Sequence, residues 1–184
     1  GGFTWKKISN GVDGPVDFHS MALSRVNPNL MYGSFQGNIQ RSTDQGKTWE
    51  IVSRNHNPVS LATDSQDENR VYAVDAQGQG ILVSIDKGEV WESLSNELEG
   101  GLVSTMALHP TDANIIFAYS EKIGGLGKST DAGMTWSNTK ELFNGEMVLH
   151  LAFDPSNPAT LYALTVENKL FKSIDMGDNW MQVR

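Results

Sequence analysis

The chain has 184 residues, of which 39% are apolar and 20% are charged, so it is long enough to bury a core without covalent cross-links. Its formal net charge of −8 argues against nucleic acid and anionic lipid as partners, and the absence of cysteine excludes disulfides and thiolate metal sites. No apolar run approaches the roughly 18 residues that a membrane span requires, so the composition predicts one globular domain without a membrane span.

The chain begins with the sequence GGFTWKKIS. Trp5 and Ile8 are apolar and flank two lysines, which we read as a short strand. GGFTW also looks like the second half of a motif that returns later with its front half attached. We therefore predict an extra outer strand over residues 2–9.

Four copies of the complete motif follow along the chain. They are STDQGKTW at 42–49, SIDKGEVW at 84–91, STDAGMTW at 129–136 and SIDMGDNW at 173–180. The closing Trp residues recur every 42–45 residues. A period of this length suits one four-stranded blade of a β-propeller.

The segments between the motifs also repeat. SMALSRVNPNLMYG, SLATDSQDENRVYA, TMALHPTDANIIFA and HLAFDPSNPATLYA each read as strand, turn and strand, because apolar residues flank a centre rich in Pro, Asn and Asp. A third strand precedes each motif, and a fourth is expected to begin at its Trp. The sequence predicts an all-β propeller of antiparallel four-stranded blades, in one domain, at about 10–53, 54–95, 96–140 and 141–184.

Each motif is expected to form the tight turn between the third and fourth strands. Its Asp and Ser can accept hydrogen bonds from backbone N–H groups, its Gly can adopt positive φ, and its Trp can bury a large surface. The predicted structural residues are Ser42, Asp44, Gly46, Trp49, Ser84, Asp86, Gly88, Trp91, Ser129, Asp131, Gly133, Trp136, Ser173, Asp175, Gly177 and Trp180.

These four segments resemble the Asp-box, or bacterial neuraminidase repeat, of sialidases, sortilin-type receptors, xyloglucan-active glycosidases and a photosystem assembly factor. The resemblance covers essentially the whole chain and implies a propeller whose Asp-boxes lie away from the binding face. The runs HPTDAN and STDAGMTW also resemble exported bacterial proteins of the glycosyl hydrolase-like repeat type. This likeness implies an extracytoplasmic location, either secreted or on the cell surface.

One outer strand is surplus, because four sets of three inner strands stand beside five Trp-led outer strands. Three explanations remain. The chain is part of a propeller with more blades, which a start inside a motif favours. Two copies share a ring or swap the terminal strand, since an unpaired edge recruits partners. Or four blades close with a frayed end.

Ligand-binding residues are expected on the loops between blades and between second and third strands. The predicted binding residues are Asp17, His19, Arg54, His56, Asp75, Glu121 and Glu167. Glycoside hydrolysis would need two carboxylates flanking a bond, and surface loop carboxylates are usually just solvated. The sequence identifies no such pair.

The sequence gives less support to sialidase chemistry, phosphate binding and metal ligation. Sialidase chemistry needs an arginine cluster and a Tyr nucleophile, but the five arginines are scattered. The run GKST at 127–130 lacks the glycine that a phosphate loop requires at 122, and the four His residues lack ligand spacing. We therefore expect no metal and no cofactor. The leading hypothesis is a noncatalytic interaction module with a protein or glycan partner; the alternative is part of a repeat-type glycoside hydrolase.

Overall fold

The computed structural model describes residues 4–12 and 14–183, which form four antiparallel sheets of four strands each. Blade 1 contains β1 (Ser20–Leu23), β2 (Met31–Phe35), β3 (Asn38–Ser42) and β4 (Glu50–Arg54). Blade 2 contains β5 (Pro58–Thr63), β6 (Val71–Asp75), β7 (Ile81–Ser84) and β8 (Glu92–Ser93). Blade 3 contains β9 (Val103–Leu108), β10 (Ile116–Ser120), β11 (Gly125–Ser129) and β12 (Ser137–Asn138). Blade 4 contains β13 (Val148–Asp154), β14 (Asn157–Thr165), β15 (Leu170–Ser173) and β16 (Met181–Gln182), and the 3₁₀ turn η1 (Phe143–Gly145) precedes it.

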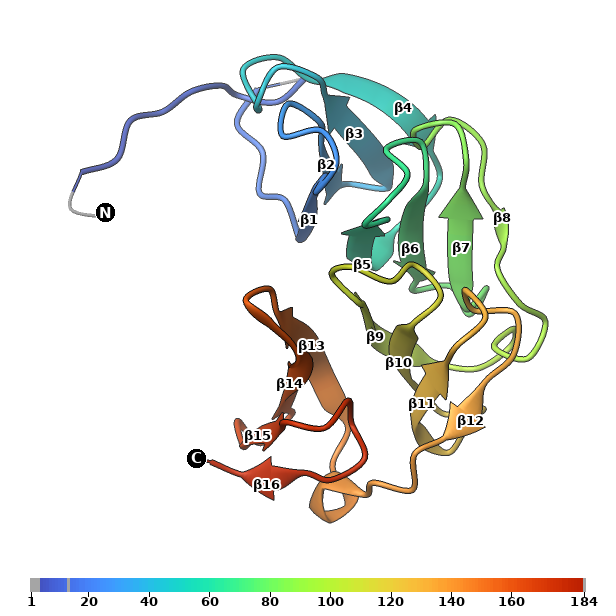
Figure 1. Ribbon diagram of the computed structural model, residues 1–184. Helices are drawn as coiled ribbons and strands as arrows, with labels where there is room; N and C mark the ends of the chain where they lie inside the picture. Colours follow the sequence, from blue (N-terminus) through green and yellow to red (C-terminus); the bar gives the residue numbers. More distant parts are fainter. Residues whose placement is uncertain (1–3, 13, 184) are drawn as a thin grey trace.

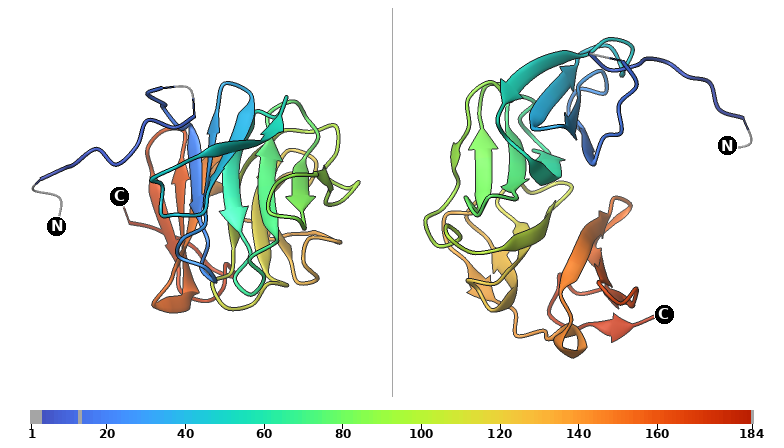
Figure 2. Two further views of the ribbon diagram at one scale, coloured as in Figure 1. Left: turned by 90° about the horizontal axis from the view of Figure 1, so that it is seen from above. Right: turned by 180° about the vertical axis from the view of Figure 1, so that it is seen from behind.

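The four blades stand around a common axis, with the first strand of each blade innermost (Figure 1). The inner strands contact one another in the order β1, β5, β9 and β13. The ring is open between blade 1 and blade 4 (Figure 1). Seen from above, the strands of the four blades run side by side, so the hairpin turns gather at two ends of the molecule (Figure 2). The predicted all-β propeller is confirmed, as a partial ring.

The hydrophobic core lies between the blades. Each sheet turns one face toward the following blade, and on that face an inner-strand Ala stands opposite a second-strand aromatic residue, as Ala22 does opposite Tyr32. Tyr32, Tyr72 and Phe117 are at most 1% exposed at the three blade–blade interfaces. Apolar side chains of the next blade complete each cluster. The repeated sequence therefore produces the same packing contact at each boundary between neighbouring blades.

The fourth strands begin one residue later than predicted, at Glu50, Glu92, Ser137 and Met181. The reason is that each Trp belongs to the turn rather than to the strand. Its indole N–H donates to the carbonyl of its own motif's glycine, as Trp49 does to Gly46 at 3.0 Å. This bond folds the ring back over the turn before the strand starts.

The strand predicted over 2–9 is absent from residues 4–9, which form no strand; Gly2 and Phe3 lie outside the described residues. In blade 1 the outer position is already taken by β4, so residues 4–9 have no ladder to join. Trp5 is 91% exposed. Ile8 nevertheless packs at Gly46, as Val52 does at Gly88. The segment thus sits where the outer strand of a preceding blade would lie.

Candidate functional site

The Asp-box turns are closed networks of hydrogen bonds. In blade 3, Ser129 Oγ accepts from the Gly133 N–H at 2.8 Å and donates to Asp131 Oδ1 at 2.8 Å. Asp131 also accepts from the Thr135 N–H at 2.9 Å and from Thr135 Oγ1 at 2.6 Å, and the Trp136 indole bonds the Gly133 carbonyl at 3.0 Å. Equivalent Ser, Asp, Gly and Trp bonds occur in the turns that begin at Ser42, Ser84 and Ser173. These donors occupy the carboxylate oxygens.

This bonding holds the Asp-box carboxylates in their ionised form. Bonds from Thr48 lower the pKa of Asp44 to about 2, bonds from Thr135 do the same for Asp131, and bonds from Asn179 lower the pKa of Asp175 to about 2. Hydrogen bonds to a carboxylate favour the charged form. A general acid needs a pKa near the working pH. These carboxylates are therefore unsuited to protonate a leaving group.

The turns divide between two ends of the molecule because the strands alternate in direction. The Asp-box turns lie beside the turns between first and second strands, as the 3.1 Å bond from the Gln45 N–H to the Asn29 carbonyl illustrates. The turns between second and third strands and the connections between blades lie at the opposite end, which we term the loop end. All seven predicted binding residues lie in or beside segments of the loop end.

The seven residues are spread over the four blades. No hydrogen bond, ion pair or ring contact joins any two of them. In blade 1, Asp17 and His19 are exposed before β1, and Arg54 is exposed at the end of β4. The His56 ring lies 6.2 Å from the Trp91 ring. The remaining residues are Asp75 in blade 2, Glu121 in blade 3 and Glu167 in blade 4.

Two loop-end carboxylates serve their own turns. Asp75 is only 4% exposed, and its Oδ1 accepts from the Gln77 N–H at 2.6 Å. Glu146, which is 9% exposed, bonds Thr165 Oγ1 and Lys169 Nζ, and thereby ties the connection before β13 to the β14–β15 turn. The Lys169 bond is the largest cause that lowers the pKa of Glu146. Both carboxylates are thus engaged in holding loops.

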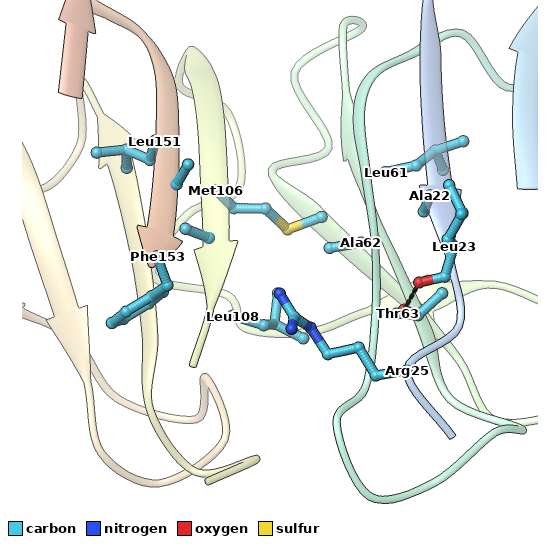
Figure 3. Close-up of a pocket in the computed structure, with 12 residues that line it drawn as sticks. Ala22, Leu23, Arg25, Leu61, Ala62, Thr63, Met106, Leu108, Leu151 and Phe153 are labelled. Atoms are coloured by element: carbon cyan, nitrogen blue, oxygen red, sulfur yellow. Dashed lines mark hydrogen bonds between the residues drawn. The ribbon is translucent and has the colours of Figure 1, made fainter. Parts of the chain in front are cut away.

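A cavity of about 240 Å³ lies on the axis, where all four blades meet (Figure 3). Its wall consists of residues 22–23, 61–63, 106–108 and 151–153, together with Arg25. These stretches belong to the ends of the inner strands that lead toward the Asp-box turns. None of the seven predicted binding residues lines the cavity, and none of its lining residues carries a carboxylate.

Arg25 is the one cation among the mostly apolar side chains that line this cavity. Its side chain extends from the end of β1 toward Leu108 (Figure 3). Within the described part of the chain, its guanidinium forms no hydrogen bond or ion pair. In the other repeats the aligned residues are Ser65, Pro110 and Pro155. In the sequence, Arg25 is only one of five scattered arginines; the signal missed there is that only the first repeat has a cation at this position.

Across 4–12 and 14–183, no three His, Cys, Asp or Glu side chains are grouped so that they could hold a metal ion. No helix within these residues is long and apolar enough to cross a membrane.

The repeated Asp-box motif corresponds to a known family. The family model described as Sortilin, neurotensin receptor 3 (Sortilin-Vps10) matches residues 37–128, which is half of the chain. This chain belongs to the Sortilin-Vps10 family. The matched region of this family member runs from the turn before β3 into β11. The predicted resemblance to Asp-box propellers, those of sortilin type included, is confirmed, while no curated protein sequence matches the chain.

Several solved structures share the propeller fold of this chain. The GH74 enzyme of Niastella koreensis superimposes with a TM-score of 0.72 at 20% identity, over 90% of this chain and 30% of that one. The GH74 xyloglucanase from Xanthomonas campestris gives 0.60 at 15%, over 91% and 38%. YCF48 bound to D1 peptide gives 0.64 at 18%, over 98% and 58%. At these identities the likeness concerns the fold, and the chain spans less than two thirds of each of these proteins.

Proposed function

We propose that this chain is a noncatalytic interaction module of an exported protein, which binds a protein or glycan ligand. The observation that carries the proposal is the axial cavity, whose lining side chains are mostly apolar, include the single cation Arg25 and contain no carboxylate. Ligand sites are typically apolar with a few well-placed polar groups, whereas glycoside hydrolysis needs two carboxylates beside the bond. Export is supported by the resemblance to exported repeat proteins.

The chemistry of the cavity favours an apolar segment that carries a carboxylate. A guanidinium can pair with a carboxylate through two parallel hydrogen bonds, and Arg25 has no such partner within the described residues. The Leu108, Leu151 and Phe153 side chains beside it would hold an apolar side chain. A peptide that ends in apolar residues fits both requirements. The similar fold of YCF48 bound to D1 peptide supports a peptide as ligand.

We predict that Arg25→Glu weakens binding of such peptides about tenfold or more, because the charge-assisted bonds are replaced by repulsion. The measurement is a titration of wild type and variant with the best ligand from an array of peptides that carry free C-terminal carboxylates. Arg54→Glu is the matched control, since it makes the same charge change on an exposed residue at the loop end. If both variants weaken binding equally, or neither does, the axial cavity is not the site.

The seven loop-end residues remain a second proposed contact surface. They belong to all four blades, so a ligand that engaged several of them would span the loop end. Binding that Arg54→Glu weakens while Arg25→Glu leaves it unchanged would move the site to this end.

Part of a repeat-type glycoside hydrolase is the second candidate function. The fold likeness to two GH74 enzymes favours it. The reaction would require a carboxylate pair about 5 Å apart for retention, or farther apart for inversion. Release of reducing sugar from xyloglucan or another glycan by this chain would support the hydrolase and contradict the noncatalytic proposal.

Self-association through residues 4–9 also remains a prediction of the sequence. The segment forms no strand ladder with its own chain, so its edge is available to a second copy. Deletion of the segment would abolish an association of this kind.

A further inference from the structure

Two blade faces in the open ring have no neighbouring blade. We term the face that a blade turns toward the following blade its forward face, and the opposite one its rear face. On the forward face of blade 4, Ala152, Tyr162 and Lys172 stand directly opposite one another across β13, β14 and β15. Ala152 is exposed, whereas the equivalent Ala107 of blade 3 is 7% exposed beneath blade 4. The forward face of blade 4 is therefore uncovered.

The covered forward faces show what such a surface contacts. In blade 3, Lys128 Nζ donates to the Met176 carbonyl at 3.1 Å and lies 3.8 Å from a carboxylate oxygen of Asp178. Met176 and Asp178 flank the glycine of the Asp-box in blade 4. A third-strand cation thus meets two groups of the following Asp-box turn, a carbonyl before its glycine and an acid after it.

Blade 1 makes the same pair of contacts with blade 2. Arg41 Nη1 donates to the Lys87 carbonyl at 3.0 Å, and Arg41 Nη2 lies 3.4 Å from Glu89 Oε1. Lys87 and Glu89 flank the Asp-box glycine of blade 2 in the same way. At the third-strand position that Arg41 and Lys128 occupy, blade 2 has Val83, which carries no charge. The Asp-box of the following blade 3 has Met134 after its glycine. The residue after the glycine is acidic wherever the preceding blade offers a cation.

Lys172 is the member of this series without a following turn. Its Nζ lies 5.6 Å from the centre of the Tyr162 ring, as Lys128 Nζ lies 5.4 Å from the Phe117 ring. Lys172 is thus placed as Lys128 is. Among the described residues, however, it has neither a hydrogen-bond acceptor nor an ion-pair partner.

We propose that the forward face of blade 4 docks an Asp-box turn that carries an acidic residue after its glycine. The occupant is a further Asp-box blade other than blade 1 of a second copy. In blade 1 the residue after Gly46 is Lys47, which would stand against Lys172. Like charges brought together at an interface suppress a wrong partner. On the rear face of blade 1, Met21 is 44% exposed where the equivalent Met106 is 4% exposed, while Phe18 packs against Trp49 and Ile8 lies at Gly46.

The chain itself supplies the probe, because Lys47→Glu places an acid where the docking turn requires one. We expect Lys47→Glu to raise the head-to-tail association constant about tenfold over wild type, measured by sedimentation equilibrium across a concentration series. Adding Lys172→Ala to Lys47→Glu should return the association constant to the wild-type value, because the cation that would pair with the new acid is lost. Lys140→Glu is the control of equal charge change, on an exposed residue outside both faces.

These variants test whether the forward face of blade 4 docks an Asp-box turn that has an acidic residue after its glycine. A gain in Lys47→Glu that Lys172→Ala removes and Lys140→Glu does not reproduce supports it. Lys47→Glu that associates no more than wild type overturns it. A gain that persists without Lys172 also overturns it, because the chains would then meet through another surface. Circular dichroism of each variant checks that the blades are folded.

Discussion

Phe117→Ala is expected to lower the free energy of unfolding by about 3–5 kcal/mol, as truncation of a large buried aromatic does. Phe117 is fully buried between blades 3 and 4. Its ring centre lies 5.8 Å from that of Phe153, and its edge closes on Gly177 of the following Asp-box. Urea denaturation followed by tryptophan fluorescence measures the loss.

Tyr162→Ala is the matched control for this prediction. Tyr162 holds the same position on β14 as Phe117 does on β10, but it faces the uncovered side of blade 4 and is only partly buried. Its truncation should cost clearly less, because less apolar area is lost from the core. Equal losses for the two variants would mean that the forward face of blade 4 is covered in solution.

Gly133→Ala is expected to lower the free energy of unfolding by about 2–4 kcal/mol, the sum of left-handed backbone strain and overpacking. Gly133 has a φ of 90°, and a Cβ at this position would lie 2.4 Å from Leu94 Cδ2. Leu94 belongs to the connection from blade 2, so its side chain at the boundary between blades 2 and 3 would have to shift. Thermal and urea denaturation of the variant measure the effect.

Ala132→Gly tests whether the strain is specific to the glycine position. Ala132 also has a positive φ, of 60°, and Gln45, Lys87 and Met176 show that non-glycine residues occupy this position in every turn. The change should alter the free energy of unfolding by no more than about 1 kcal/mol. A loss as large as that of Gly133→Ala would contradict the assignment of the clash to Leu94.

The repeat made the fold predictable from sequence. A motif that recurs every 42–45 residues specifies a blade, and the side chains that build its turn, such as Ser129 and Asp131, are near neighbours in the chain. Local hydrogen bonds of this kind depend little on the rest of the molecule. Four blades could therefore be predicted without knowledge of how they pack.

The parts that depend on neighbouring blades could not be predicted in this way. The segment around Trp5 resembles a strand in sequence, but a strand must pair with the edge of a sheet. Residues 4–9 pair with no sheet. In the sequence, Arg25 belongs to a turn. It lines a cavity only because the four inner strands converge in the folded chain. The match of Arg41 to Glu89 also joins residues far apart in the sequence, so only the packed blades reveal it.

Small-angle X-ray scattering of the 20.2 kDa chain at several concentrations tests whether four Asp-box blades form an open arc with two uncovered faces. The curve extrapolated to zero concentration is expected to match that calculated for the open arc of Figure 1, with blade 1 apart from blade 4. A more compact curve that fits a ring closed by contact of β1 with β13 would contradict the open arc, because no face would then remain for a further blade.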